Sequence, residues 1–144
     1  MPTTALPEEI EWSSPDSISN CFKEIKSGGT FVSFGWCDPK LGESGDMLEE
    51  LCELLNKSKK IQALDLENAA LSDSAVEAIC ESLKKNKSLH TLILTNNDLG
   101  AIAAKAIDEL LKLNKTLKRI NLADNPRIPP HIKQSIDAQL EARQ

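Results

Sequence analysis

The sequence predicts an α/β fold: a short solenoid of about four β-α units, with parallel strands on the concave side, helices on the convex side and helical caps at both ends. Three observations lead to this fold. A short apolar pattern with strand-like alternation recurs at a spacing of 28 residues. An apolar stripe with helical spacing follows the copies, and an amphipathic segment stands at either end of the series. A unit of this kind cannot cover its own apolar face, so neighbouring units stack.

The repeat is clearest at its first, fourth and sixth positions. The pattern occurs as Ile61-x-x-Leu64-x-Leu66, Leu89-x-x-Leu92-x-Leu94 and Leu117-x-x-Ile120-x-Leu122, 28 residues apart each time. A weaker copy, Phe31-x-x-Phe34-x-Trp36, stands 30 residues upstream and puts aromatic residues in the leucine positions. Alternation with period two sends the fourth and sixth residues of each copy to one face of a strand and their neighbours to the other.

A turn and a helix follow each predicted strand. Asn97 and Asn125 stand three residues after the last leucine of their copies, where a side-chain amide can bond backbone groups of the turn. Ala69 fills this position in the preceding unit, so we expect that turn to be held less firmly. Asn86 and Asn114 end the helices, and we expect both to adopt the left-handed conformation of a C-terminal cap.

Both ends of the series carry a predicted cap. At the upstream end, Ser14-Pro15-Asp16 predicts a helix over 14–27, because Pro suits the first helical position. Gly28-Gly29 ends this helix, whose apolar stripe covers the first strand. At the downstream end, apolar residues spaced four apart predict a helix over 130–142.

These boundaries define one predicted domain over 14–144, with repeats over 31–128. Residues 1–13, which hold two prolines and three glutamates, predict a flexible tail. Within this tail, Ile10 and Trp12 are the residues suited to dock on the first unit.

The pattern L-x-x-L-x-L-x-x-N-x-L is the signature of leucine-rich repeats. With its period of 28 residues and a helix in each unit, the chain resembles the ribonuclease-inhibitor-like class. Segments 81–89 (ESLKKNKSL) and 110–117 (LLKLNKTL) resemble the repeats of tropomodulin and leiomodin in particular. The resemblance covers residues 30–144 and implies a solenoid that binds a protein partner, with actin as one such partner.

Composition excludes several classes of function. Apolar residues make up 40% and charged residues 27%, as in soluble globular proteins, and 20 leucines supply an aliphatic core. The net charge of −5 argues against nucleic-acid binding, which depends on lysine and arginine neutralising phosphates. The sequence shows no secretory signal, lipidation motif or membrane span. We therefore expect a cytoplasmic protein that is a monomer on its own.

No constellation of residues predicts catalysis. The four cysteines form no C-x-x-C pair, and their spacing fits no metal set with the two histidines; they are Cys21, Cys37, Cys52 and Cys80. We expect free, mostly buried thiols. Ser27-Gly28-Gly29 is too short for a phosphate-binding loop. The sequence thus predicts a protein without enzymatic activity, cofactor or metal site.

The strand residues that point away from the core form the candidate binding surface. The predicted partner-binding residues come from three neighbouring strands and are Asp65, Glu67, Thr91, Ile93, Thr95, Arg119 and Asn121. Ile93 is the predicted anchor, because a branched apolar side chain in a polar face is costly to leave in water and anchors cluster at interface centres. The alternative is a solvated face that binds nothing.

Charged residues predict a second feature. Nine lysines precede the strands, three in each unit: Lys57, Lys59, Lys60, Lys84, Lys85, Lys87, Lys112, Lys115 and Lys118. Acidic residues gather at the opposite edge: Asp38, Glu43, Asp46, Asp73, Asp98 and Asp124. The simplest explanation is that both sets complement the helix dipoles. The alternatives for the lysines are an acidic protein partner or an anionic lipid headgroup.

Together these features predict a noncatalytic protein-protein interaction module that serves as a small scaffold or adaptor, or as a subunit of a larger assembly. The resemblance to tropomodulin adds a second hypothesis, a regulator of actin and the cytoskeleton. The resemblance to the ribonuclease-inhibitor-like class adds a third, an inhibitor that occludes a partner enzyme.

Overall fold

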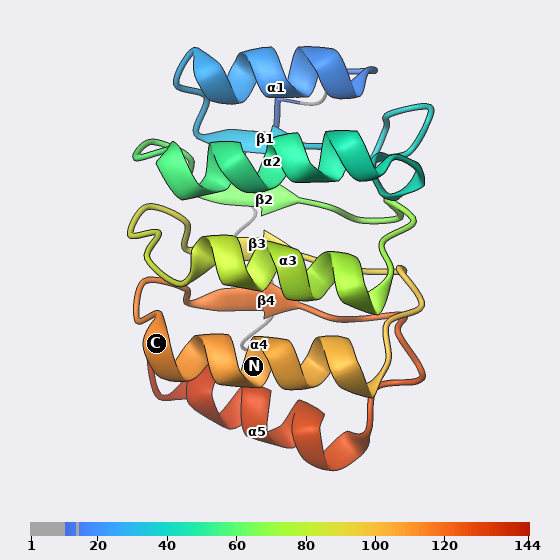
Figure 1. Ribbon diagram of the computed structural model, residues 1–144. Helices are drawn as coiled ribbons and strands as arrows, with labels where there is room; N and C mark the ends of the chain where they lie inside the picture. Colours follow the sequence, from blue (N-terminus) through green and yellow to red (C-terminus); the bar gives the residue numbers. More distant parts are fainter. Residues whose placement is uncertain (1–10, 14) are drawn as a thin grey trace.

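A computed structural model describes residues 11–13 and 15–144 and shows a parallel sheet backed by one layer of helices (Figure 1). The strands are β1 (Phe31–Ser33), β2 (Ala63–Asp65), β3 (Thr91–Ile93) and β4 (Arg119–Asn121). The helices are α1 (Ile18–Lys26), η1 (Leu41–Glu43, a 3-10 helix), α2 (Gly45–Lys57), α3 (Asp73–Leu83), α4 (Ala101–Leu113) and α5 (Pro130–Glu141). The predicted α/β solenoid of stacked β-α units is confirmed.

The strands pair in chain order, β1-β2-β3-β4, and all pairs are parallel. Each return from one strand to the next passes through a helix, as parallel pairing requires. The helices consequently lie side by side on one face of the sheet, in the order α1 to α5 from top to bottom of Figure 1.

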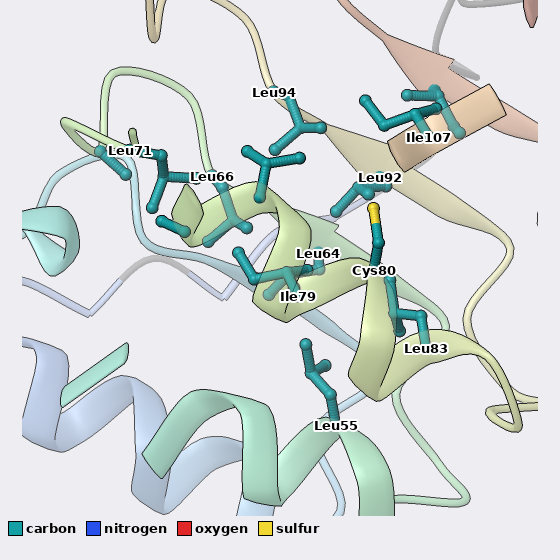
Figure 2. Close-up of a cluster of buried hydrophobic side chains, with 14 of the residues drawn as sticks. Leu55, Leu64, Leu66, Leu71, Ile79, Cys80, Leu83, Leu92, Leu94 and Ile107 are labelled. Atoms are coloured by element: carbon teal, nitrogen blue, oxygen red, sulfur yellow. The ribbon is translucent and has the colours of Figure 1, made fainter. Parts of the chain in front are cut away.

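The core lies between the two layers. Leu64, Leu92 and Ile120 stand in register at the centres of neighbouring strands, and none has any exposed surface. Figure 2 shows the leucines of β2 and β3 packed together with Ile79 and Leu83 of α3. Burying a side chain of this size contributes about 1.5–3 kcal/mol relative to leaving it in water, so these layers dominate the stability of the fold.

The first repeat has a different register from the predicted one. Val32 pairs with Leu64, an offset of 32 residues, and Val32 and Phe34 fill the core positions. The predicted assignment, in which Phe34 and Trp36 fill them with an offset of 30, is wrong. A shift of two residues preserves the alternation of faces, so the pattern alone could not decide between the two registers.

Two buried asparagines, Asn97 and Asn125, tie each turn to the unit before it. The Asn97 Oδ1 accepts from the backbone N–H groups of Ala69 and Leu71 at 3.0 and 3.1 Å, and its Nδ2 donates to the Leu66 carbonyl at 2.9 Å. Asn125 makes the equivalent bonds one repeat later. The next repeat thus supplies hydrogen bonds to the Ala69 turn. That turn still lacks the bonds that Asn97 makes within its own turn, to the Leu94 and Thr95 carbonyls at 3.1 and 3.2 Å, as expected of an alanine in this position.

The asparagines at the helix ends form a second such series. Asn114 has φ −95° and ψ 117°, and Asn86 does not have a positive φ either. The predicted left-handed caps are therefore wrong. Instead, the amide Nδ2 of Asn86 donates to the Leu55 carbonyl at 2.8 Å, and that of Asn114 to the Leu83 carbonyl at 2.7 Å. These side chains join consecutive helices rather than cap their own.

The upstream helix begins later than predicted. It starts at Ile18, and Ser17 is its N-cap, with the hydroxyl accepting from the Asn20 N–H at 3.2 Å. A proline at the first helical position is only one of two local signals here, and the serine side chain, which satisfies an otherwise unpaired N–H, sets the start. Ser14, the predicted start, lies outside the described residues.

Part of the predicted tail belongs to the fold. Ser13 forms a parallel bridge with Val32, and the rings of Trp12 and Phe31 meet edge to face with centroids 6.4 Å apart. Trp12 thus docks on the first unit as expected. The remainder of the predicted tail, residues 1–10 with Ile10, lies outside the described residues.

The downstream cap closes the other end. Ile136 and Leu140 of α5 are completely buried against the last repeat. Beyond the helix, the Arg143 guanidinium donates to the carbonyls of Asn114 and Leu117 at 2.8 and 2.7 Å. Arg143 therefore satisfies backbone groups that a further repeat would otherwise bond.

Candidate functional site

We call the surface opposite the helices the outer sheet face. It consists of the strand side chains that alternate with core residues, because alternate side chains of a strand point to opposite faces. One row across it is Asp65, Ile93 and Asn121, and another contains Thr91 and Arg119. Glu67 and Thr95 continue the alternation past the ends of β2 and β3. The strand register thus brings the predicted partner-binding residues onto one face.

Their exposure differs from the expectation. Ile93 is only 4% exposed, and Thr91 and Thr95 are buried as well. Asp65 and Asn121 flank Ile93 in register on the two neighbouring strands, which lie about 4.8 Å away. Ile93 is therefore not the exposed apolar anchor that the alternation suggested.

The polar residues of this face are held by local hydrogen bonds. The Asp65 carboxylate accepts from the Ser33 hydroxyl and from the Glu67 N–H, both at 2.9 Å. Asn121 Oδ1 accepts from the Ala123 N–H at 3.0 Å. Asp65 and Asn121 are half-buried and Glu67 is exposed. These bonds fix the side chains before any partner arrives, which lowers the entropic cost of ordering them on binding.

His90 supports the same face from the start of β3. Its Nδ1 lies 2.9 Å from the Thr91 hydroxyl oxygen. Burial lowers the pKa of the imidazole below its ordinary 6.5, and the positive charges of Arg119 and Lys118 lower it further. His90 is therefore neutral at pH 7.

Trp36 is a surface residue, although the sequence pattern placed it in a core position. Its side chain is 75% exposed, the most exposed large apolar side chain among the described residues. It follows Gly35 just beyond β1, near the end of the sheet where Glu67 lies. The register shift in β1 explains the misplacement, since Trp36 corresponds to Asn68 and not to Leu66. Gly29 stands where the other copies have leucine or isoleucine, so the sequence pattern gave no signal of the shift.

The lysine edge consists of the nine lysines that precede β2, β3 and β4, and all nine are exposed. It runs along the loops that lead from each helix into the next strand, at the left of Figure 1. Within the part of the chain that the structure describes, only Lys84 and Lys112 pair with carboxylates, those of Glu81 and Asp108.

The acidic edge lies on the other side, and at Asp73 its role is structural. The Asp73 carboxylate accepts from the N–H groups of Gly100 and Ala103 at 3.1 and 3.0 Å. Gly100 is the N-cap of α4 and has no side chain to do this, so Asp73 caps the helix of the next repeat. Arg127 lies between Asp73 and Asp98, with its Nε 3.1 Å from the Asp98 carboxylate.

A family model described as leucine-rich repeat matches residues 57–80 and 85–107, which hold β2, β3 and the first parts of α3 and α4. The strands β2, β3 and β4 pair at a constant offset of 28 residues. The chain thus carries leucine-rich repeats at 57–80 and 85–107 and has the fold of a short leucine-rich-repeat solenoid. Compared by sequence with curated proteins, the leucine-rich-repeat domain has no significant match.

Two solved structures share its fold. The tropomodulin C-terminal domain of Caenorhabditis elegans superposes with a TM-score of 0.69 at 14% identity, covering 94% of this chain and 84% of that one. Leiomodin-1 actin-binding site 2 superposes with a TM-score of 0.57 at 16% identity, covering 90% of each chain. The resemblance of the repeats to those of tropomodulin and leiomodin is confirmed at the level of the fold.

The leucine-rich-repeat domain has four free cysteines. The folded chain brings Cys37 and Cys21 together, with sulfurs 3.4 Å apart, although 16 residues separate them. Burial raises the pKa of all four thiols, that of Cys80 to about 12, so none is an activated nucleophile.

Among the described residues, no three His, Cys, Asp or Glu side chains lie together as a metal site would need. None of the helices in that part of the chain has the length and apolar character needed to cross a membrane.

Proposed function

We propose that this leucine-rich-repeat domain is a noncatalytic protein-recognition module whose partner docks on the outer sheet face. The observation that carries the proposal is a group of accessible charged and polar side chains from three adjacent strands, with buried side chains among them on the same face. Asp65, Glu67, Arg119 and Asn121 have accessible surface, while Thr91, Ile93 and Thr95, along the strand between them, are buried.

The arrangement favours a partner of mixed charge. Glu67 and Asp65 supply negative charge on β2, and Arg119 supplies positive charge on β4, two strands away. Opposite charges at the two sides of an interface fix the orientation of a partner more than they raise its affinity. Trp36 adds an exposed aromatic surface at the β1 end, of the kind that interfaces use as an anchor.

Actin is the specific partner that we propose, with an adaptor or scaffold role for another protein as the broader form of the hypothesis. The support for actin is the similarity to the structure described as an actin-binding site of leiomodin-1. The third hypothesis, inhibition of a partner enzyme by occlusion, has less support, because a sheet of four strands offers little surface to wrap around a target.

Co-sedimentation with actin filaments, together with a pointed-end assembly assay, tests the specific form. We expect the domain to sediment with filaments and Glu67→Lys to weaken binding about tenfold, equivalent to about 1.4 kcal/mol. Glu109→Lys makes the same charge change on the exposed surface of α4 and is the matched control. Binding that is lost equally in both variants, or only in the control, contradicts the outer sheet face as the site.

If actin does not bind, affinity capture from cell extract tests the broader form with the same pair of variants. A partner retained by Glu109→Lys and lost by Glu67→Lys supports docking on the outer sheet face. A partner retained equally by both variants contradicts it.

A further inference from the structure

The lysine edge is more than a complement to the helix dipoles. The dipole effect is confined to the last turn of a helix. Only Lys57 in α2 and Lys112 in α4 occupy last turns, and α3 has no basic residue there. Of the other seven, Lys84 is the C-cap of α3 and Lys115 donates to the Leu111 carbonyl in the last turn of α4. The remaining five lie beyond the helix ends, so helix stabilisation leaves much of this charge unexplained.

The concentration of charge is large for an acidic chain. The edge holds nine of the 17 lysines and arginines, although the net charge of the protein is −5. Among the described residues, Lys57, Lys59, Lys60, Lys85 and Lys87 make no ion pair. Like charges held side by side repel one another, and an acidic ligand would relieve this repulsion.

Apolar surface accompanies the lysines at both ends of the edge. A hollow of about 430 Å³ opens between the ends of α1 and α2, with Ile25 and Leu54 in its lining and Lys57, Lys59 and Lys60 around it. At the other end, Leu113, which follows Lys112 in the sequence, is 62% exposed. A ligand that matches this edge therefore combines negative charge with apolar side chains.

We propose that the lysine edge binds an extended acidic segment of a partner protein, with an apolar side chain of that segment in the hollow between α1 and α2. Packed helices lie about 8–10 Å apart, so three spacings from α1 to α4 span roughly 25–30 Å, the length of about nine extended residues. Both features suit a peptide: the charge runs in a line, and the hollow accepts a side chain. This site is separate from the outer sheet face and does not depend on a partner binding there.

Fluorescence anisotropy with a labelled peptide tests the proposal. The probe is a 12-residue peptide of glutamates with two leucines, and the comparison peptides replace the leucines by serine or the glutamates by glutamine. We expect the acidic leucine peptide to bind the domain, binding to weaken with added salt, and both replacements to reduce the affinity at least fivefold. Failure of the acidic leucine peptide to bind overturns the proposal.

A pair of variants locates the site. Lys85→Glu with Lys87→Glu reverses two exposed, unpaired lysines at the middle of the edge, and we expect at least a tenfold loss of peptide affinity. Lys105→Glu with Lys133→Glu makes the same charge change away from the edge, and we expect less than a twofold loss. Equal losses in the two variants mean that the peptide responds only to net charge, which overturns the site.

Vesicles containing phosphatidylserine test the competing ligand. We expect them to bind the domain no better than neutral vesicles do. Binding to anionic vesicles that is lost in Lys85→Glu with Lys87→Glu, without binding of the peptide, identifies the edge as a membrane-binding surface and overturns the peptide proposal.

Discussion

The first unit of the solenoid, α1 with β1, is joined to its neighbour differently from the units that follow. Between the later units, Asn97 and Asn125 link the turns, and Asn86 and Asn114 link the helices. In the first unit neither link exists. Ala69 occupies the position that Asn97 and Asn125 occupy in later turns, and it has no side-chain amide to bond the turn after β1. Ser58 occupies the helix-end position of Asn86 and Asn114, and among the described residues its hydroxyl accepts only from the N–H groups of Lys60 and Ile61 in its own loop.

Other contacts replace these links. Cys37 occupies the turn position in the first repeat, and its thiol meets that of Cys21 on α1 in the buried interior. The Lys40 ammonium donates to the Asn68 carbonyl at 2.8 Å, and the Gly42 N–H donates to the Ala69 carbonyl at 2.8 Å. Gly42 is required there, because a Cβ would lie 2.0 Å from the Ala70 carbonyl oxygen. The same fold is thus held by specific amide bonds at one end and by close packing at the other.

The largest effect is expected from the shared core position. Leu92→Ala should lower the free energy of unfolding by about 2–5 kcal/mol, because it leaves a cavity in the central layer. Val32→Ala, at the register-equivalent position in β1, removes two carbons instead of three and should cost less. Urea unfolding of both variants measures the difference. A loss for Leu92→Ala below that for Val32→Ala would contradict the assignment of the central layer.

A smaller but more diagnostic effect is expected from the turn position. Asn97→Ala leaves buried N–H and carbonyl groups without partners, at a cost of about 2–4 kcal/mol in unfolding free energy. Cys37→Ala removes only a small thiol from the equivalent position and should cost about 1 kcal/mol or less. Denaturant unfolding separates the two. Similar losses for both variants would mean that the amide bonds contribute nothing specific.

The smallest effect concerns pH and His90, which stands at the position that Thr30 occupies before β1. Because the native pKa of His90 lies below 6.5, the unfolded chain takes up its proton first as the pH falls. Stability present above pH 6.5 is therefore lost as the pH drops through that value towards the native pKa. Unfolding free energies between pH 8 and 5 should fall less steeply in His90→Gln than in the native protein. An unchanged slope would contradict a half-buried, neutral imidazole.

The sequence predicted the repeats best where the leucine pattern is regular. The strands β2, β3 and β4 lie where the spacing of Leu64, Leu92 and Ile120 placed them. The register of β1 could not be predicted, because Gly29 replaces the first leucine and a shift by two residues keeps the alternation of faces.

The face on which the candidate residues lie was predicted, but their exposure was not. Alternation correctly assigned Asp65, Ile93 and Asn121 to one face, since it depends only on neighbours along the strand. How much of Ile93 remains exposed depends on the side chains of the adjacent strands, which no local pattern contains. The asparagine links were missed for the same reason, because they join residues 26–31 positions apart.

The asparagine links determine at which end local unfolding of the solenoid begins. Each linking amide satisfies backbone groups of the preceding unit, so opening one of the later units exposes unpaired buried groups in its neighbour as well. Detaching α1 and β1 leaves no such amide behind, since none crosses that boundary. Local unfolding in a stacked array begins at the interface with the weakest neighbour coupling. This domain is therefore built to fray from its first unit, while the units from β2 to α5, closed by Arg143, open and close together.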